Sequence, residues 1–184
     1  MSMKKQIKEE IDLLYKTYVN DLFSYALNLG FDRDTSMDAI HDVFYKICSD
    51  EKILDKIVNI RFYLLRALKN RLLDIYKQKR DVVEFSTDSE TEEIPFNIHV
   101  TVEDLIIEEE EQDIVRAKVE QLLESLTDRQ REIIYLRYSQ DCDYEEIAQL
   151  MHITVPACRK LFHKAIIKLR KNPYSAILLL ILLN

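Results

Sequence analysis

Apolar residues recur along most of this chain with the three- and four-residue spacing that places them on one face of a helix. These ladders predict helices over residues 7–26, 34–47 and 60–79, and a longer helix over residues 101–123 that opens with a capping-box-like sequence at Thr101. Gly30 ends the first ladder, since glycine is common just beyond the last turn of a helix. The pattern is that of a mainly helical protein.

Three more helix starts follow in the last third of the chain. The sequences Thr-Asp-Arg-Gln from Thr127 and Asp-Tyr-Glu-Glu from Asp143 both match the capping box, in which two side chains satisfy the free N–H groups of a first helical turn. Thr154 is a third capping residue, with Pro156 in the first turn, where a missing N–H costs nothing. We therefore predict three helices in quick succession after residue 127.

Turn-forming residues are scarce, with one glycine and three prolines among 184 residues. A fold built on β-hairpins needs far more of both, so we predict an all-α fold of two small helical domains. Residues 81–100 are acidic, rich in Ser and Thr, and contain Pro95, which is a linker composition. The predicted organisation is a domain over residues 1–80, an acidic linker over 81–100, a second domain over 101–172 and an apolar tail over 173–184.

The formal net charge of −7 argues against nucleic-acid binding, but the charges are not spread evenly. Residues 61–80 hold seven basic side chains and one acid, and residues 151–172 hold six basic side chains and no acid. Residues 81–113, between them, hold 13 acids and no Lys or Arg. Two basic blocks separated by an acidic stretch suggest two DNA-facing surfaces joined by a linker.

The second basic block has the spacing of a helix-turn-helix, over residues 144–163. Apolar residues fill the positions that such a unit buries, and Ala148 is the small residue where its two helices cross. His152 stands in the turn, where φ is often positive and glycine is usual; histidine tolerates that conformation better than most residues. A helical hairpin with a merely solvated basic face is the alternative interpretation of this segment.

Catalytic and metal-binding motifs are missing from the sequence. It has no glycine-rich phosphate loop, no G-x-S-x-G and no H-E-x-x-H, its four histidines are scattered, and its three cysteines form no C-x-x-C pair. We therefore expect no catalytic activity, no cofactor and no metal.

Neither end of the chain predicts export or membrane insertion. The first residues lack the apolar core of a secretory signal, and the apolar run at 176–183 is far shorter than the roughly 20 residues of a spanning helix. The chain is therefore expected to be cytoplasmic. The tail is expected either to pack on the second domain as a short helix or to be covered by a partner.

Residues 121–171 strongly resemble region 4 of the extracytoplasmic-function (ECF) group of RNA polymerase sigma factors, most specifically in the Arg-Gln-Arg-Glu start and the Tyr-Glu-Glu-Ile-Ala helix entry. Residues 38–47 resemble region 2.2 of the same family, and residues 60–80 resemble regions 2.3 and 2.4. The resemblance implies transcription initiation with core RNA polymerase and promoter DNA as partners, and an anti-sigma factor as a further candidate partner.

The resemblance also assigns residues to each partner. Region 2.2 implies polymerase contacts by Asp38, His41, Asp42 and Lys46. Regions 2.3 and 2.4 imply contacts with the −10 promoter element by Arg66, Lys69, Asn70, Lys77, Lys79 and Arg80. Region 4 implies contacts with the −35 element by Thr154, Arg159, Lys160, His163 and Lys164.

The sequence departs from the family pattern at several of these places. In region 2.2, His41 replaces a common glutamine. In region 4, Leu161 replaces a common arginine and Pro156 removes a possible backbone contact, so the base preference does not transfer. Phe62 and Tyr63 stand where the family often has an aromatic pair that includes tryptophan, which this chain lacks.

Two other functions fit parts of the sequence. A free-standing helix-turn-helix regulator would bind duplex DNA without polymerase. A helical adaptor that binds only proteins would show no salt-dependent affinity for DNA.

Overall fold

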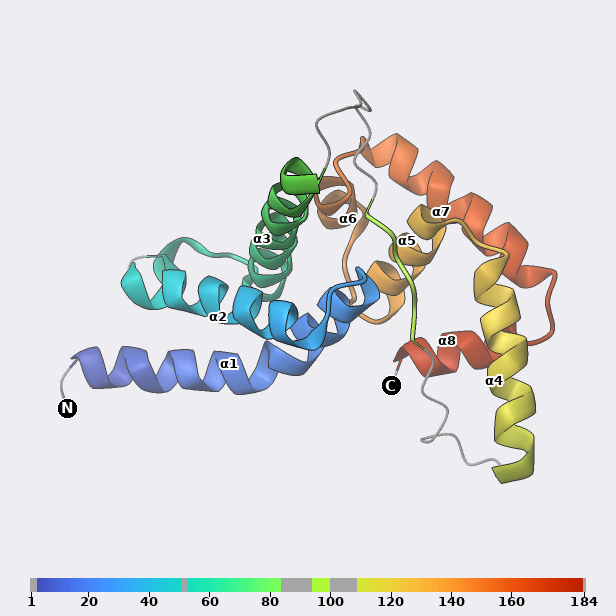
Figure 1. Cartoon of the computed structure of the whole chain (residues 1–184), viewed down its shortest axis with the longest axis horizontal. Coiled ribbons are helices and arrows are strands. Elements are labelled where there is room, and N and C mark those ends of the chain that lie inside the picture. The colour runs from blue at the N-terminus through green and yellow to red at the C-terminus, as the bar shows by residue number, and fades with distance from the viewer. Residues whose placement is uncertain (1–2, 51–52, 84–93, 100–108, 184) are drawn as a thin grey trace. The chain divides into compact units, whose positions relative to one another are not determined.

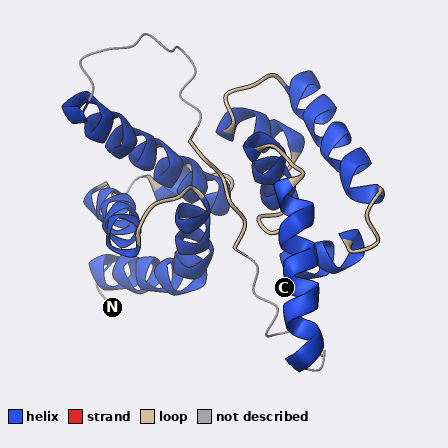
Figure 2. Cartoon of the chain, turned by 45° about the vertical axis from the view of Figure 1, so that its right-hand side comes forward, coloured by secondary structure: helices blue, strands red, loops and turns tan. Residues whose placement is uncertain are grey.

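The computed structural model describes residues 3–50, 53–83, 94–99 and 109–183, with side chains described from residue 9 and outside 80–83 and 109–112. Every regular element in these ranges is helical, which confirms the predicted all-α class (Figure 2). The chain divides into two compact units, Met1–Ile94 and Pro95–Asn184. The start of the expected helix at Thr101 lies outside the described residues.

The first unit is a bundle of three helices that all pack on one another: α1 (Met3–Asn28), α2 (Arg33–Ser49) and α3 (Ile60–Val83) (Figure 1). A short 3-10 helix, η1 (Leu54–Lys56), precedes α3. The apolar ladders face inward, and Tyr25, Ile40 and Leu68 are fully buried. The bundle therefore holds α2 and α3 side by side with their polar faces outward.

A tight turn joins α1 to α2. Gly30 has a φ of +80°, a conformation that costs glycine little, and Asp32 caps α2 by accepting a hydrogen bond from the Thr35 N–H at 2.9 Å. This hydrogen bond lowers the pKa of Asp32 below its ordinary value. The predicted helix end and helix start are both confirmed.

The second unit contains α4 (Glu109–Glu124), α5 (Asp128–Tyr138), α6 (Tyr144–Leu150), α7 (Val155–Arg170) and α8 (Ser175–Leu183). Helix α5 packs against α6, α7 and α8. Both predicted capping boxes are present, at Thr127 and at Asp143, and Thr154 caps α7. Local sequence signals thus set where α5, α6 and α7 begin.

The apolar tail folds as α8 and packs against α4 and α5. Leu178 and Leu182 are buried, and the Ser139 hydroxyl donates a 2.9 Å hydrogen bond to the Leu182 carbonyl. This confirms intramolecular packing of the tail. One side of α8 stays open to solvent, with Leu180 56% and Leu183 63% exposed.

Residues 95–99, which the sequence analysis assigns to the linker, belong to the second unit. Phe96 is fully buried there and its ring contacts that of Tyr135 on α5, 5.6 Å between centroids. Arg131 Nε donates a 2.7 Å hydrogen bond to the Phe96 carbonyl. Composition alone did not reveal this, because the partners of Phe96 lie on a helix far along the chain.

Candidate nucleic-acid interfaces

Helices α6 and α7 form the predicted helix-turn-helix. Ile147 and Cys158 are fully buried between the helices, and Ala148 is 3% exposed at their crossing. Burial raises the pKa of the Cys158 thiol, so this side chain acts as a small apolar core residue. His152 has a φ of +52°, as expected for this turn. The local backbone is therefore that of a helix-turn-helix.

The outer face of α7 carries exposed basic and polar side chains. The residues predicted to face DNA are all on the surface: Thr154, Arg159, Lys160, His163 and Lys164. The Thr154 hydroxyl oxygen accepts from the Ala157 N–H at 3.4 Å, which leaves the hydroxyl hydrogen able to donate to a phosphate. This helix face suits the major groove of DNA, where Arg and Lys reach guanine edges and phosphates.

The outer face of α3 carries a second set of exposed polar side chains, Arg66, Asn70 and Lys77, whereas Lys79, also exposed, lies two residues after Lys77 and so on a different side of the helix. Lys69 does not belong to this set. Its side chain is only 7% exposed, because it lies four residues after Leu65 and three before Leu72, within the apolar stripe. We therefore correct the predicted surface by removing Lys69. The side chain of Arg80 lies outside the described residues.

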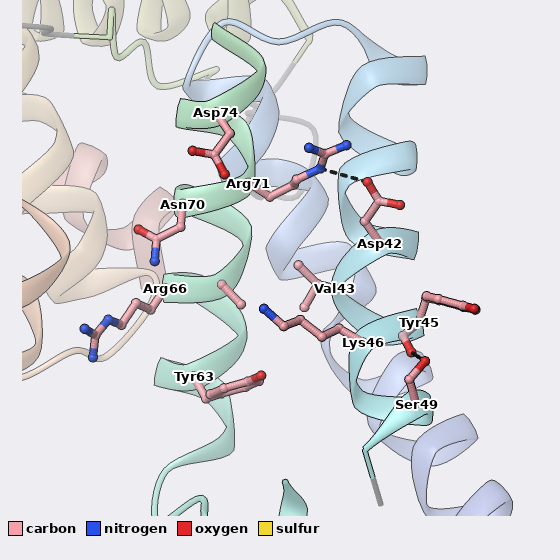
Figure 3. Close-up of a pocket in the computed structure, with 11 residues that line it drawn as sticks. Asp42, Val43, Tyr45, Lys46, Ser49, Tyr63, Arg66, Asn70, Arg71 and Asp74 are labelled. Carbon is pink, nitrogen blue, oxygen red and sulfur yellow. Dashed lines mark hydrogen bonds and ion pairs between the residues drawn. The ribbon is translucent and has the colours of Figure 1, made fainter. Parts of the chain in front are cut away.

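A pocket of about 760 Å³ lies between α2 and α3 (Figure 3). Lys46 reaches into it from α2, and Tyr63, Arg66 and Asn70 line it from α3. Burial raises the pKa of the Tyr63 hydroxyl above its ordinary value. An aromatic ring beside basic and amide groups is suited to holding an unpaired base and its phosphate.

The face of α2 that the sequence assigned to polymerase is exposed at all four positions: Asp38, His41, Asp42 and Lys46. Two of these residues have partners within the bundle. The His41 ring stacks on Tyr15, and His41 Nε2 lies 3.2 Å from Tyr15 Oη. Asp42 accepts a 2.8 Å hydrogen bond from Arg71 Nε of α3, so a partner protein that binds Asp42 competes with Arg71.

Sequence reasoning missed two residues of this surface. Tyr45 is 75% exposed and follows Asp38, His41 and Asp42 in the sequence at the spacing of one helix face. That spacing could have identified it. Arg71 of α3 was missed because its partner, Asp42, lies on α2. No local sequence pattern on α3 reveals that contact.

Comparison with known proteins agrees with this geometry. Residues 116–169, which contain the helix-turn-helix, match the family model "Sigma-70, region 4". The RNA polymerase sigma factor YlaC of Bacillus subtilis is 24% identical over 166 residues, which cover 90% of this chain and 92% of that protein. The ECF RNA polymerase sigma factor SigX of the same organism is 20% identical over 169 residues, 90% of this chain and 84% of that protein. Along most of its length the chain is therefore similar to sigma factors, one of them from the ECF group.

The fold of this chain is also found in a solved structure. The sigma factor RpoE of Bartonella quintana, solved in complex with the anti-sigma factor NepR, superposes with a TM-score of 0.57 at 18% identity, over 89% of this chain and 96% of that chain. At this identity the likeness concerns the fold. The similarity to whole sigma factors extends over both units, which a helix-turn-helix regulator with one DNA-binding domain would not explain.

The sequence predicted no membrane-spanning segment, and the helices of the structure can be compared with that expectation. Among the described residues, no helix combines the length and the apolar character needed to cross a lipid bilayer.

Proposed function

We propose that this chain is an ECF sigma factor, which binds core RNA polymerase and directs it to promoter DNA, with one recognition surface on each unit. The supporting observation is that both basic helix faces, on α3 and on α7, are exposed to solvent. The assigned role is one of binding and positioning, and the chemistry of RNA synthesis belongs to polymerase. The proposed division is region 2 over residues 1–80 and region 4 over 101–172, with the linker shortened at its end because residues 95–99 pack on the second unit.

The α7 surface is proposed to read the −35 element. Arg159 and Lys160 lie near the start of the helix, where a recognition helix meets base edges, and His163 and Lys164 follow one turn later. The free hydroxyl hydrogen of Thr154 is assigned to a phosphate oxygen. Loss of one base-reading side chain should cost about 1–3 kcal/mol of discrimination.

The pocket between α2 and α3 and the adjoining α3 surface are proposed to hold the −10 element as an unpaired strand. Tyr63 offers a stacking face, Arg66 and Asn70 offer donors at the pocket wall, and Lys77 extends the cationic track along α3. Lys79 adds positive charge from another side of the same helix. Binding through this track should weaken steeply as salt rises, because cations released from the phosphates dominate its free energy.

The exposed face of α2 is proposed to dock on polymerase. Asp38 and Asp42 offer carboxylates to a basic partner surface, and Lys46 and His41 flank them. Docking at Asp42 would displace Arg71, whose guanidinium lies at the rim of the pocket.

An anti-sigma factor is proposed as a further partner, on the precedent of the sigma factor solved with its anti-sigma factor. Such a partner would prevent initiation by covering one of the surfaces that polymerase or the promoter needs.

The proposal is tested by transcription with purified core polymerase of the host, fragments of host DNA and mapping of the RNA 5′ ends. Adding the wild-type chain should produce a defined set of start sites. Arg159→Ala with Lys164→Ala should reduce these transcripts about tenfold, the loss expected when a base contact and a phosphate contact disappear. Lys118→Ala, which removes an exposed cation from α4, is the matched control and should change them less than about twofold.

Two results would contradict the proposal. If the wild-type chain adds no specific start site on any host fragment, it is not a sigma factor in function. If the purified chain binds a specific duplex tightly without polymerase, it acts as a free-standing regulator.

A further inference from the structure

The ring of Tyr144, at the start of α6, lies between two arginine side chains. The guanidinium carbon of Arg159, from α7, is 5.5 Å from the ring centroid, and that of Arg137, from α5, is 5.6 Å away. Both distances are within the range of cation–π attraction. Three helices of the second unit thus meet at one aromatic side chain.

Further contacts hold the Tyr144 ring in place. Phe162 of α7 packs edge-on against it, with 5.6 Å between the ring centroids. Arg137 is anchored by a 2.8 Å hydrogen bond from its Nη1 to the Cys142 carbonyl. The ring therefore has defined neighbours from α5 and α7 and offers Arg159 a fixed surface.

Arg159 has a second, weaker partner in Glu145, next to Tyr144. The distance from Arg159 Nη2 to Glu145 Oε1 is 3.7 Å, and the two side chains are 63% and 59% exposed. An ion pair this long and this exposed contributes little by itself, because water screens the charges. The ring is the stronger constraint, since a planar guanidinium lies well on an aromatic face.

The direction of Arg159 matters because this side chain belongs to the surface assigned to the −35 element. A long flexible side chain loses rotamer freedom when it binds a base edge, and that loss weakens binding unless the side chain is already ordered. The ring of Tyr144 restricts Arg159 before DNA arrives. Lys160, on the same face, has no described aromatic contact.

We propose that Tyr144 is a positioning residue for promoter recognition: its ring holds the guanidinium of Arg159 in the orientation that reads one base pair of the −35 element, and Glu145 assists. This inference rests on the proposed function of α7. In this proposal Arg159 contacts the base pair, and Tyr144 of α6 sets the orientation of Arg159.

The first experiment uses the holoenzyme and a promoter found by 5′-end mapping, with each −35 base pair substituted in turn. Arg159→Ala should flatten discrimination at one base pair. Tyr144→Met, which keeps apolar volume but removes the ring, should reduce discrimination at that same base pair by about fivefold, the scale of one exposed cation–π contact. Tyr144→Phe keeps the ring and should stay within about twofold of wild type.

Two further controls separate positioning from mere folding. Combining Tyr144→Met with Arg159→Ala should add no further loss at that base pair, because both changes act through one contact. The slope of affinity against salt should not change in Tyr144→Met, since no phosphate contact is removed. Equal loss at every −35 position, or unchanged discrimination in Tyr144→Met, would overturn the inference.

The second experiment needs neither DNA nor polymerase. In the NMR spectrum of the full-length chain, the Nε–Hε signal of Arg159 should carry a ring-current shift in the wild type and in Tyr144→Phe, and should lose it in Tyr144→Met. The same Arg159 shift in all three proteins would overturn the inference. If only the transcription assay fails, because the wild type starts no specific transcript, the proposed function fails while the Arg159 contact is still tested.

Discussion

A single residue in the turn between α6 and α7 of the second unit has a strained backbone conformation. His152 has a φ of +52°, in the left-handed region that costs most residues about 1–2 kcal/mol. The conformation persists because Met151 on one side is buried and the Ile153 N–H donates to the Ala148 carbonyl at 3.0 Å. The turn therefore keeps a backbone conformation that glycine would adopt at lower cost.

Substitutions at His152 should reveal this strain. His152→Val should lower the free energy of unfolding by about 1–2 kcal/mol, because a β-branched side chain tolerates positive φ poorly. His152→Gly should cause no loss, since glycine adopts this conformation readily. Urea unfolding of both variants followed by circular dichroism checks this. Equal stability of the valine and glycine variants would show that the turn relaxes without cost.

Local residue signals were sufficient where the structure depends on neighbours in sequence. Thr127, Asp143 and Thr154 were identified as caps because a cap involves only the next three residues. Lys69 was misplaced because its charge was given more weight than its position between Leu65 and Leu72. The partners of Arg71 and Tyr144 come from other helices, so no local sequence pattern indicated them.

Helices and segments of the second unit are held by contacts that composition hides. The sequence around Phe96 resembles a linker, yet Arg131 fastens this segment to α5 while also donating to the Leu123 and Leu126 carbonyls, 3.1 Å in both cases. One arginine thus ties the entry of the second unit to the end of α4. A second domain that begins at residue 101, as predicted from the sequence, would omit this segment.

Phe96→Ala tests whether the segment is part of that core. Removing a fully buried aromatic ring leaves a cavity, so the free energy of unfolding of the second unit should fall by about 3 kcal/mol. Asn97→Ala, at the exposed neighbouring position, is the control and should change it by less than about 0.5 kcal/mol. Thermal unfolding of the full chain measures both. If both variants change the free energy of unfolding by a similar small amount, residues 95–99 are part of the linker and not of the core.

Helix α8 gives a matched pair of leucines on one element. Leu178 is fully buried against the unit, whereas Leu180 is 56% exposed. Leu178→Ala should lower the free energy of unfolding by about 2–4 kcal/mol, and Leu180→Ala by less than about 0.5 kcal/mol. Chemical unfolding monitored by circular dichroism distinguishes them. If both variants match the wild type, α8 does not stabilise the unit.

The two units form a molecule whose net charge of −7 conceals two cationic surfaces. Basic residues gather on α3 in one unit and on α7 in the other, while the acidic stretch falls between them in sequence. The charge blocks were readable from sequence because each coincides with one helix. The sequence did not reveal which of these basic side chains face solvent, because that depends on how the helices of each unit pack. The proposed function requires that both surfaces contact one promoter at the same time.

Photo-crosslinking within the holoenzyme tests this claim most directly. A crosslinking amino acid is placed at Arg66 on α3 or at Arg159 on α7, and the crosslinked promoter positions are mapped. Position 66 should crosslink to the −10 element, and position 159 should crosslink to the −35 element of the same promoter. The same crosslinking amino acid at Lys118 on α4 is the control and should give no crosslink. Crosslinks from only one of the two positions, or from both to the same element, would contradict the proposed function.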